Sequence, residues 1–343
     1  MAHKVGVLGS GSFGTTICKL LGNQNEVLLY TRRDEIVRSV NIAHSLKGYT
    51  LPDTVRATTS LEELGRKCRL IFPIIPSQHF RNVLEDISPF VGPGHIMIHG
   101  TKGLDVSDNF ENATSLSDIK KSVFTMSEVI AQSTSVVRYG ALAGPNLAKE
   151  ILEGQPAATV IASPFDEVIS MGRKALADKL FLVYGSHYLK GIELAGALKN
   201  TIAIASGLMN GIGFGKNMQA LLITRGLREM ILISKAVGAA ETPFFGTAGI
   251  GDLIATTTST NSRNYTFGHK LGKGKTAQEV LAEMEETAEG YRTINFANRI
   301  VEAAKLQAPL IKTLYEIVYE GKPIKKALVA LLHNRLEKDV DFL

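Results

Sequence analysis

The sequence predicts an α/β protein in which a mostly parallel sheet is followed by a part built only of helices. Two observations support this fold class. Up to about Ser186, short apolar runs with strand character alternate with helix-like segments, which is typical of βαβ units and a parallel sheet. After Ser186 the strand signal ends, and apolar residues recur at helical spacing. A chain of 343 residues is long enough for two domains, which we expect at residues 1–188 and 189–343.

The expected strands are short apolar runs separated by turn residues. The clearest lies at residues 69–75, which are apolar almost without interruption, as in a parallel strand covered on both faces. The other strands are expected at residues 4–8, 26–30, 55–59, 95–99, 139–143, 157–162 and 181–184.

Helices are expected where apolar residues recur every three to four positions. In the first domain these are residues 13–21, 34–44, 77–87, 121–132, 147–152 and 166–178. In the second domain they are residues 192–208, 218–237, 277–285, 293–304, 309–319 and 323–332.

The composition favours a soluble cytoplasmic protein. The net charge is +5, but the basic residues are scattered and form no aromatic-interleaved stretch, so no nucleic-acid partner is expected. No run of 18 apolar residues occurs, so we expect no stable membrane insertion. Cys18 and Cys68 are too few for a disulfide framework, and the eight histidines lack metal-ligand spacing, so we expect no metal.

A glycine-rich segment directly follows the first expected strand and opens a helix. Its residues fit the pattern G-x-G-x-x-G and are Gly9, Ser10, Gly11, Ser12, Phe13 and Gly14. Glycines at these positions allow a tight turn, close approach of the backbone to a diphosphate and close helix–strand packing. The helix N-terminus adds unpaired N–H groups and a favourable dipole. In this context the segment predicts a dinucleotide site.

The end of the second expected strand indicates which dinucleotide is preferred. An acidic residue there usually binds the adenosine ribose of NAD, whereas this chain has Arg32 and Arg33. Guanidinium groups suit a ribose 2′-phosphate. We therefore expect NADPH to be preferred over NADH, although Asp34 could serve the ribose if the strand extends further.

Lys199 is the one cation in an apolar segment that has the character of a buried helix. No carboxylate lies three or four residues away, so a buried Lys199 needs a partner from elsewhere in the fold. Desolvation would lower the pKa of the ammonium and suit it to proton transfer. The alternative is a lysine that extends to solvent from the edge of the core.

Asp252 is the candidate partner of Lys199. It follows three glycines and opens a helix-like stretch that reaches Thr256, so a plain N-cap is the alternative. Further along, Ser262, Arg263 and Asn264 combine a guanidinium with an amide, which suits a phosphate monoester, although a polar loop is also possible.

Two more loops follow expected strands, where ligands bind in open α/β sheets. One contains Thr101 and Lys102 between two glycines, and the other is Gly144, Pro145 and Asn146. Proline in a first helical turn and asparagine near a cap are sufficient structural reasons for the second loop. Together, however, these loops point to one substrate site beside the dinucleotide.

These motifs, taken in order, resemble NAD(P)-dependent glycerol-3-phosphate dehydrogenase of the bacterial type. The resemblance rests on Gly9 to Gly14, Ile75-Pro76-Ser77, Thr101-Lys102-Gly103, Ala143 to Asn146, Lys199-Asn200, Gly249 to Leu253, Ser262-Arg263-Asn264 and Glu289-Gly290. It implies a Rossmann-type domain, a helical domain like the C-terminal one of 6-phosphogluconate dehydrogenase, and a homodimer.

The resemblance also implies an activity and residue roles. The enzyme would interconvert dihydroxyacetone phosphate and sn-glycerol 3-phosphate, which supplies glycerophospholipid synthesis. Lys199 would be the general acid, supported by Asp252, and Lys102 would contact the substrate near the nicotinamide. The substrate would also meet Gly144, Asn146, Asn200, Thr256, Ser262, Arg263 and Asn264. The cofactor would meet the glycine loop, Arg32, Arg33, Pro76, Lys102, Ala148, Arg263 and Glu289.

Two other functions remain open. One is another dehydrogenase of this architecture, such as a 6-phosphogluconate or 3-hydroxyisobutyrate type. The other is a nicotinamide-sensing module without catalysis, which has no need of a buried proton donor.

The chain departs from the family pattern at one place. After Asn264 the resemblance leads us to expect a more basic stretch, but this chain has Tyr265 and Thr266, so the finer phosphate contacts are left undefined.

Overall fold

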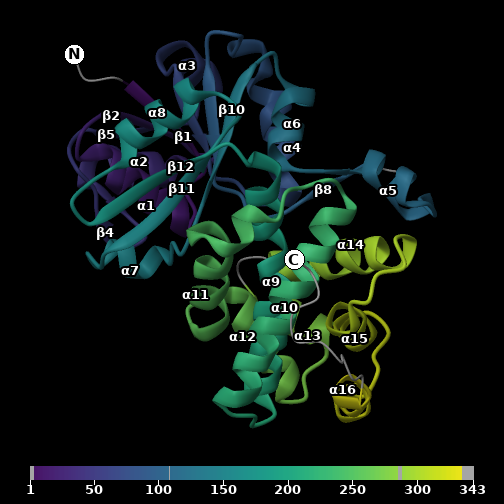
Figure 1. Ribbon diagram of the computed structural model, residues 1–343. Helices are drawn as coiled ribbons and strands as arrows, with labels where there is room; N and C mark the ends of the chain where they lie inside the picture. The colour runs from purple at the N-terminus through teal and green to yellow at the C-terminus, as the bar shows by residue number, and fades with distance from the viewer. Residues whose placement is uncertain (1–3, 108, 285–287, 334–343) are drawn as a thin grey trace. The chain divides into compact units, whose positions relative to one another are not determined.

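The computed structural model describes residues 4–107, 109–284 and 288–333 (Figure 1). Contacts between residues group the chain into two units. The first comprises Met1–Asp105 and Thr125–Leu189, and the second comprises Val106–Phe124 and Lys190–Leu343. The second unit therefore includes a segment from the first half of the sequence. The expected boundary between residues 188 and 189 stays a prediction about domains.

The first unit is built around an eight-stranded sheet. Neighbouring strands are parallel, except that β10 and β11 are antiparallel, so the mostly parallel sheet is confirmed. The strand order is β12 (Phe181–Ser186), β11 (Ala157–Ala162), β10 (Arg138–Ala143), β7 (Ile96–His99), β6 (Leu70–Pro73), β1 (Lys4–Leu8), β2 (Glu26–Tyr30) and β5 (Val55–Thr58).

Helices cover both faces of this sheet. Val5 and Val7 of β1 pack with Ile17 on one face, whereas Gly6 lies against Leu64 on the other. The helices are α1 (Ser12–Gly22), α2 (Asp34–Ala43), α3 (Leu61–Lys67), α4 (Ser77–Ile87), α6 (Met126–Ser133), α7 (Ala148–Leu152) and α8 (Asp166–Leu176). Two short ladders, β3 (Ser45–Leu46) with β4 (Tyr49–Thr50) and β8 (Asp105–Val106) with β9 (Val123–Phe124), complete the strands of the described residues.

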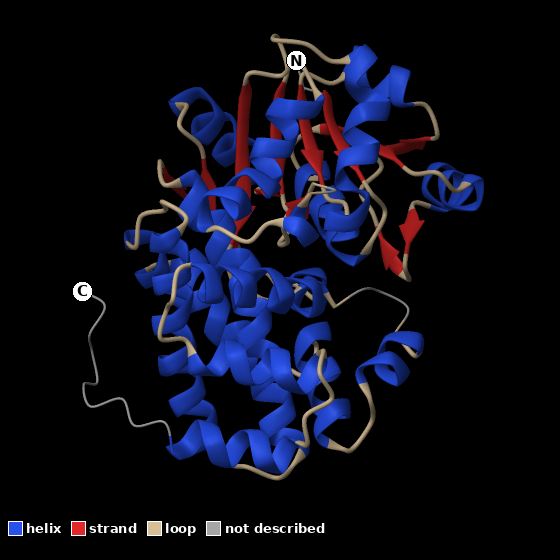
Figure 2. Cartoon of the chain, turned by 90° about the vertical axis from the view of Figure 1, so that its right-hand side faces the viewer, coloured by secondary structure: helices blue, strands red, loops and turns tan. Residues whose placement is uncertain are grey.

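The second unit is almost entirely helical (Figure 2). Its helices are α5 (Leu116–Ser122), α9 (Leu189–Gly211), α10 (Lys216–Ala236), α11 (Asp252–Thr258), α12 (Arg263–Gly272), α13 (Ala277–Ala282), α14 (Glu289–Ala303), α15 (Pro309–Val318) and α16 (Ile324–His333). None of the helices in the described ranges is both long enough and apolar enough to cross a membrane.

All eight predicted strands are present, with ends within two residues of the prediction. The helix expected at residues 121–132 was wrong at its start, because residues 121–125 contain the end of α5 and β9. The helix α6 begins only after Thr125, whose side chain forms a capping box with Glu128. The helix expected at residues 277–285 ends at Ala282, and Glu285 lies outside the described residues.

Glu229 is a buried carboxyl group that joins two helices of the second unit. It lies on α10, and its two oxygens accept hydrogen bonds from the backbone N–H groups of Leu310 and Ile311, at 2.8 and 2.9 Å. It therefore caps the first turn of α15. Burial raises the pKa of Glu229 to about 7, although these hydrogen bonds and Arg228 oppose the shift.

Because the folded-state pKa of Glu229 lies above its ordinary value, folding favours the protonated form. This contribution to stability is present at pH 4 and is lost as the pH rises through 7. We expect the free energy of unfolding to fall by up to about 3 kcal/mol as the pH rises from 4 to 8, because Glu229 loses its proton over this range. Urea unfolding of Glu229→Gln should show a smaller decline over this range.

The matched control is Glu241→Gln, a partly exposed carboxyl group that pairs with Lys235. Its pH dependence should follow that of the unaltered protein. Equal declines for Glu229→Gln and the unaltered protein would contradict the prediction.

Candidate functional site

The glycine loop between β1 and α1 is tightly folded and leaves one side open. Gly9 has a φ of +111°, and a Cβ there would lie 2.3 Å from the carbonyl oxygen of Ile74. A Cβ on Gly14 would lie 2.0 Å from the oxygen of Gly9. In contrast, a Cβ on Gly11 would meet no atom within 4 Å. The outer glycines therefore permit the turn, and Gly11 leaves space for a ligand against the backbone.

The start of α1 suits a diphosphate. Ser12 is its first residue, Gly11 provides no side-chain cap, and its first turn carries no acidic residue. The N-terminal N–H groups and the helix dipole therefore favour an anion at the open side of the loop. The ring of Phe13 lies 3.0 Å from the position of a Cβ on Gly100, which brings the loop after β7 close to α1. These residues fit a dinucleotide.

The two arginines expected to select the dinucleotide follow β2. The glycine loop is joined to this end of β2 by the hydroxyls of Ser10 and Thr31, which lie 3.0 Å apart. Arg32 and Arg33 are both exposed, and Arg33 lies 3.7 Å from Glu35. Asp34 is the first residue of α2 rather than part of the strand. The end of β2 therefore carries two guanidinium groups.

Three further loops meet at one edge of the sheet. Because β1, β6, β7 and β10 are parallel neighbours, their carboxyl ends lie at the same edge. Thr101 donates a hydrogen bond of 2.6 Å to the carbonyl of Ile75, which precedes Pro76. Lys102 donates one of 3.0 Å to the carbonyl of Gly144. These bonds hold the predicted loops of the first unit together.

The loop after β10 is held against β11. The amide of Asn146 donates to the carbonyl of Ala158 at 2.9 Å and accepts from the hydroxyl of Thr159 at 2.9 Å. A Cβ on Gly144 would lie 2.7 Å from the oxygen of Ala158. Ala148 begins α7, and its carbonyl lies 3.5 Å from the hydroxyl of Thr16 on α1. In this structure Asn146 thus fixes the loop.

The second unit contains a buried ion pair. Lys199 on α9 is 3% exposed and Asp252 is 1% exposed, and the ammonium lies 2.7 Å from the carboxylate. The ammonium also donates to the hydroxyl of Thr256, which in turn donates to the carbonyl of Asp252 at 2.7 Å. Lys199 is therefore not a lysine at the edge of the core, and its partner comes from a different helix.

An unusual turn positions Asp252. Residues Thr247–Gly251 form a π-helical turn, a feature found often at functional sites, and α11 continues directly from it. A Cβ on Gly249 would lie 2.3 Å from the carbonyl oxygen of Phe244, so only glycine fits there. Asp252 has helical backbone angles, and Gly251 occupies the N-cap position. The N-cap alternative for Asp252 was therefore wrong.

The backbones of α9 and α12 are in direct contact at glycines. A Cβ on Gly207 would lie 1.9 Å from the oxygen of Tyr265, and one on Gly268 would lie 1.9 Å from the oxygen of Ile204. Gly211 and Gly272 repeat this contact one turn further on. Asn200 of α9 and Asn264 of α12 both lie against the start of α14. Both flank Gly290, whose N–H donates to Asn264 at 2.9 Å.

The predicted phosphate residues lie at the start of α12. Ser262 is its N-cap and accepts from the N–H of Tyr265, and Arg263 is the first helical residue and is exposed. Glu289 is the first residue of α14, beside Gly290. The second unit therefore places Lys199 with Asp252 and Thr256, and it places Asn200 and Asn264 at the first turn of α14.

Sequence reasoning missed the glycines that set this helix register. Their signal was nevertheless present, because Gly207 and Gly211 are four residues apart, as are Gly268 and Gly272. Small residues at this spacing form a strip on a helix along which another backbone can approach closely.

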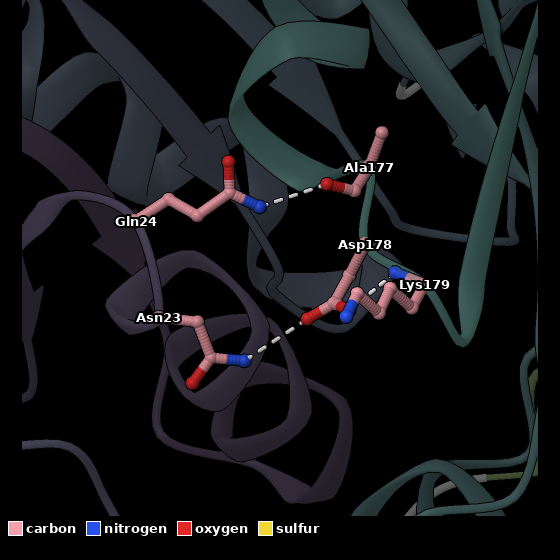
Figure 3. Close-up of a pocket in the computed structure, with 5 residues that line it drawn as sticks. All are labelled: Asn23, Gln24, Ala177, Asp178 and Lys179. Carbon is pink, nitrogen blue, oxygen red and sulfur yellow. Dashed lines mark hydrogen bonds between the residues drawn. The ribbon is translucent and has the colours of Figure 1, made fainter.

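A shallow hollow in the first unit lies away from these residues. It is lined by Asn23, Gln24, Ala177, Asp178 and Lys179 (Figure 3). Asn23 donates to Asp178 at 3.3 Å and Gln24 to the carbonyl of Ala177 at 2.8 Å. None of the predicted site residues lines this hollow, and its polar groups bind one another.

Comparison with known proteins identifies two family models that together cover most of the chain. Residues 4–169 match the NAD-dependent glycerol-3-phosphate dehydrogenase N-terminus, and residues 189–329 match the corresponding C-terminus. Glycerol-3-phosphate dehydrogenase [NAD(P)+] of Alcanivorax borkumensis is 39% identical, over 99% of this chain and 96% of that protein. The enzyme of that name from Teredinibacter turnerae is 35% identical, over 98% of this chain and 97% of that protein.

A solved structure agrees with these matches. The crystal structure of glycerol-3-phosphate dehydrogenase from Coxiella burnetii superimposes with a TM-score of 0.86 at 28% identity. The match covers 97% of this chain and 99% of that one.

The glycine contact between α9 and α12 can be tested by adding one methyl group. Gly268→Ala would place a Cβ 1.9 Å from the oxygen of Ile204, so the helices must separate. We expect urea unfolding to show a loss of about 1–3 kcal/mol or more. Gly94→Ala is the control, because nothing lies within 4 Å of that Cβ. It should change stability by less than about 0.5 kcal/mol. Equal stabilities of the two variants would disprove the contact.

Proposed function

The chain belongs to the NAD-dependent glycerol-3-phosphate dehydrogenase family, and we propose that it reversibly reduces dihydroxyacetone phosphate to sn-glycerol 3-phosphate with NADPH or NADH. The observation that carries this proposal is the buried ion pair between Lys199 on α9 and Asp252 on α11, whose charged groups lie 2.7 Å apart. We further propose that the enzyme acts in the cytoplasm as a homodimer and supplies glycerophospholipid synthesis.

Lys199 is the proposed general acid. Reduction of a ketone builds negative charge on its oxygen, and an ammonium group there stabilises that charge and supplies the proton. In the reverse direction the neutral amine takes the proton of the hydroxyl. Asp252 and Thr256 hold the ammonium in place by direct hydrogen bonds. The reduced nicotinamide, when bound, supplies the hydride.

The substrate phosphate is assigned to the start of α12. Arg263 offers an exposed guanidinium, and Ser262 and Asn264 flank it. Binding the phosphate, which does not react, would hold the carbonyl of the substrate near Lys199, and this aids catalysis as well as binding. Further substrate contacts are proposed for Lys102, Gly144, Asn146, Asn200 and Thr256.

The dinucleotide is assigned to the glycine loop and the start of α1, where the backbone is open and the helix dipole favours its diphosphate. Arg32 and Arg33 would bind the 2′-phosphate of NADPH. Further contacts are proposed for Pro76, Lys102, Ala148, Arg263 and Glu289.

The proposed reaction predicts that the purified protein oxidises NADPH when dihydroxyacetone phosphate is added, and far more slowly with unphosphorylated dihydroxyacetone. The loss of absorbance of the reduced nicotinamide measures this rate. We expect Lys199→Ala to lower kcat at least about 100-fold, because a positioned general acid contributes that much or more. Its affinity for NADPH, measured by fluorescence titration, should be unchanged.

Lys199→Arg serves as a second variant, because removing Lys199 leaves Asp252 buried without its partner and can cost about 3–5 kcal/mol. Arginine keeps the positive charge but cannot give up a proton near neutral pH, so turnover should also be lost. Turnover close to normal in either variant would exclude Lys199 as the acid. Tight NADPH binding without any turnover of dihydroxyacetone phosphate would favour the sensing module.

The coenzyme preference is tested by replacing both arginines after β2. Arg32→Ala/Arg33→Ala should lower kcat/KM for NADPH about 10- to 100-fold, because charge-assisted hydrogen bonds to one phosphate at this exposed position contribute about 1.5–3 kcal/mol in total. The kcat/KM for NADH should change little, since NADH has no 2′-phosphate. The control is Arg38→Ala, an exposed arginine one turn further along α2. Equal losses with both coenzymes would contradict the assignment.

A further inference from the structure

The chain makes an excursion directly after the loop that carries Lys102. Lys102 and Asp105 belong to the first unit, but residues 106–124 belong to the second. The excursion contains a single 3₁₀ turn, Phe110–Asn112, and the short helix α5. Its two ends are joined by a hydrogen bond of 2.9 Å from the N–H of Ser107 to the carbonyl of Ser122.

Arg299 on α14 holds this excursion by three hydrogen bonds. Its guanidinium donates to the carboxylate of Glu111, to the carbonyl of Glu111 and to the carbonyl of Ala113, each at 2.9 Å. Two of the three acceptors are backbone oxygens, so the bonds fix the path of the chain as well as a side chain. The side chain of Arg299 is only 20% exposed, which limits competition from water.

Phe110 completes the attachment. It is 2% exposed and packs edge-to-face against Phe296 of α14, with ring centroids 5.2 Å apart. The guanidinium of Arg299 lies 4.6 Å from the centroid of the Phe110 ring, within the range of a cation–π interaction. We call Phe110, Glu111, Phe296 and Arg299 the α14 clamp.

A second attachment lies on the other side of the crossing between the units. Arg81 of α4 donates to the carboxylate of Asp105 at 2.7 Å and to the side chain of Gln132 at 3.0 Å. Phe110 follows Asp105 by five positions, a stretch of chain that can span about 18 Å at most. The crossing is therefore short and is fastened at both ends.

We propose that the α14 clamp positions Lys102 for catalysis, an inference that rests on the proposed reaction. Lys102 precedes Asp105 by three residues, so fastening the chain to α14 restricts how far its loop can move. The same helix begins with Glu289 and Gly290, which lie next to Asn264. Arg299 is thus a positioning residue that acts on the substrate through Lys102.

A double-mutant cycle separates this role from a merely structural one, because residues that act through each other have non-additive effects. In the unaltered background, Arg299→Ala should lower kcat/KM for dihydroxyacetone phosphate at least tenfold. In the Lys102→Ala background the same change should cost less than threefold. Adding Arg299→Ala should change the affinity for NADPH by less than twofold in either background. Equal fold-losses in the two backgrounds would overturn the proposal.

Hydrogen exchange of the full-length chain provides a readout that does not depend on activity. Arg299→Ala should speed exchange of the amides at residues 101–105 as well as within the excursion. Faster exchange confined to the excursion would overturn the positioning role. Hydrogen exchange tests whether the α14 clamp positions residues 101–105 even if the unaltered protein does not reduce dihydroxyacetone phosphate. A lack of that activity would refute the proposed function separately.

Two further variants complete the test. Arg299→Lys is used if Arg299→Ala does not fold. Lysine keeps the charge but cannot reach all three acceptors, so Arg299→Lys should show the same changes in kcat/KM and hydrogen exchange, but smaller.

Arg138→Ala is the matched control, because Arg138 is 22% exposed and binds Glu167 at 2.7 Å and the carbonyl of Pro93 at 2.8 Å. It should leave exchange at residues 101–105 unchanged, and faster exchange there would show that the effect is not specific to the clamp.

Discussion

The helical unit depends on one buried ion pair. Taking the Lys199 ammonium and the Asp252 carboxylate out of water costs several kcal/mol for each ion. Lys199 is 3% exposed and Asp252 is 1% exposed, so water stabilises these charges little. The attraction between the two groups, 2.7 Å apart, and the hydrogen bond of the ammonium to the hydroxyl of Thr256 must offset the cost. Such geometry is satisfied only if α9 and α11 keep their positions closely. Burying the Lys199 ammonium, the proposed proton donor, therefore requires that the surrounding helices keep closely defined positions.

The backbone around the pair meets these constraints through glycine. The π-helical turn before Asp252 needs Gly249, because any Cβ would collide with Phe244. The contact of α9 with α12 needs Gly207 and Gly268, and it fixes which residues of the two helices face each other. Gly249 also accepts a hydrogen bond from the backbone N–H of Asp252. The glycines therefore fix the backbone around the residues assigned to the chemistry.

The sequence was sufficient for features that depend on local chemistry. Short apolar runs gave all eight strands of the sheet, and the glycine loop is placed as its spacing requires. Features that depend on packing between distant segments were not accessible. Asp252 was predicted as the candidate partner of Lys199 and is confirmed, but the contact of the ammonium with Thr256 depends on how α9 and α11 pack. The excursion at residues 106–124 was missed because its place depends on Phe110 packing against Phe296.

The two halves of the proposed chemistry require opposite environments, which explains why the chain separates them. A diphosphate needs open backbone N–H groups, and Gly11 leaves that space free. A proton donor that is held by direct hydrogen bonds and shielded from water needs burial, which α9 gives to Lys199. One small unit cannot easily provide both. The chain instead passes between its units three times, after Asp105, Phe124 and Leu189. The α14 clamp lies directly after the first of these crossings.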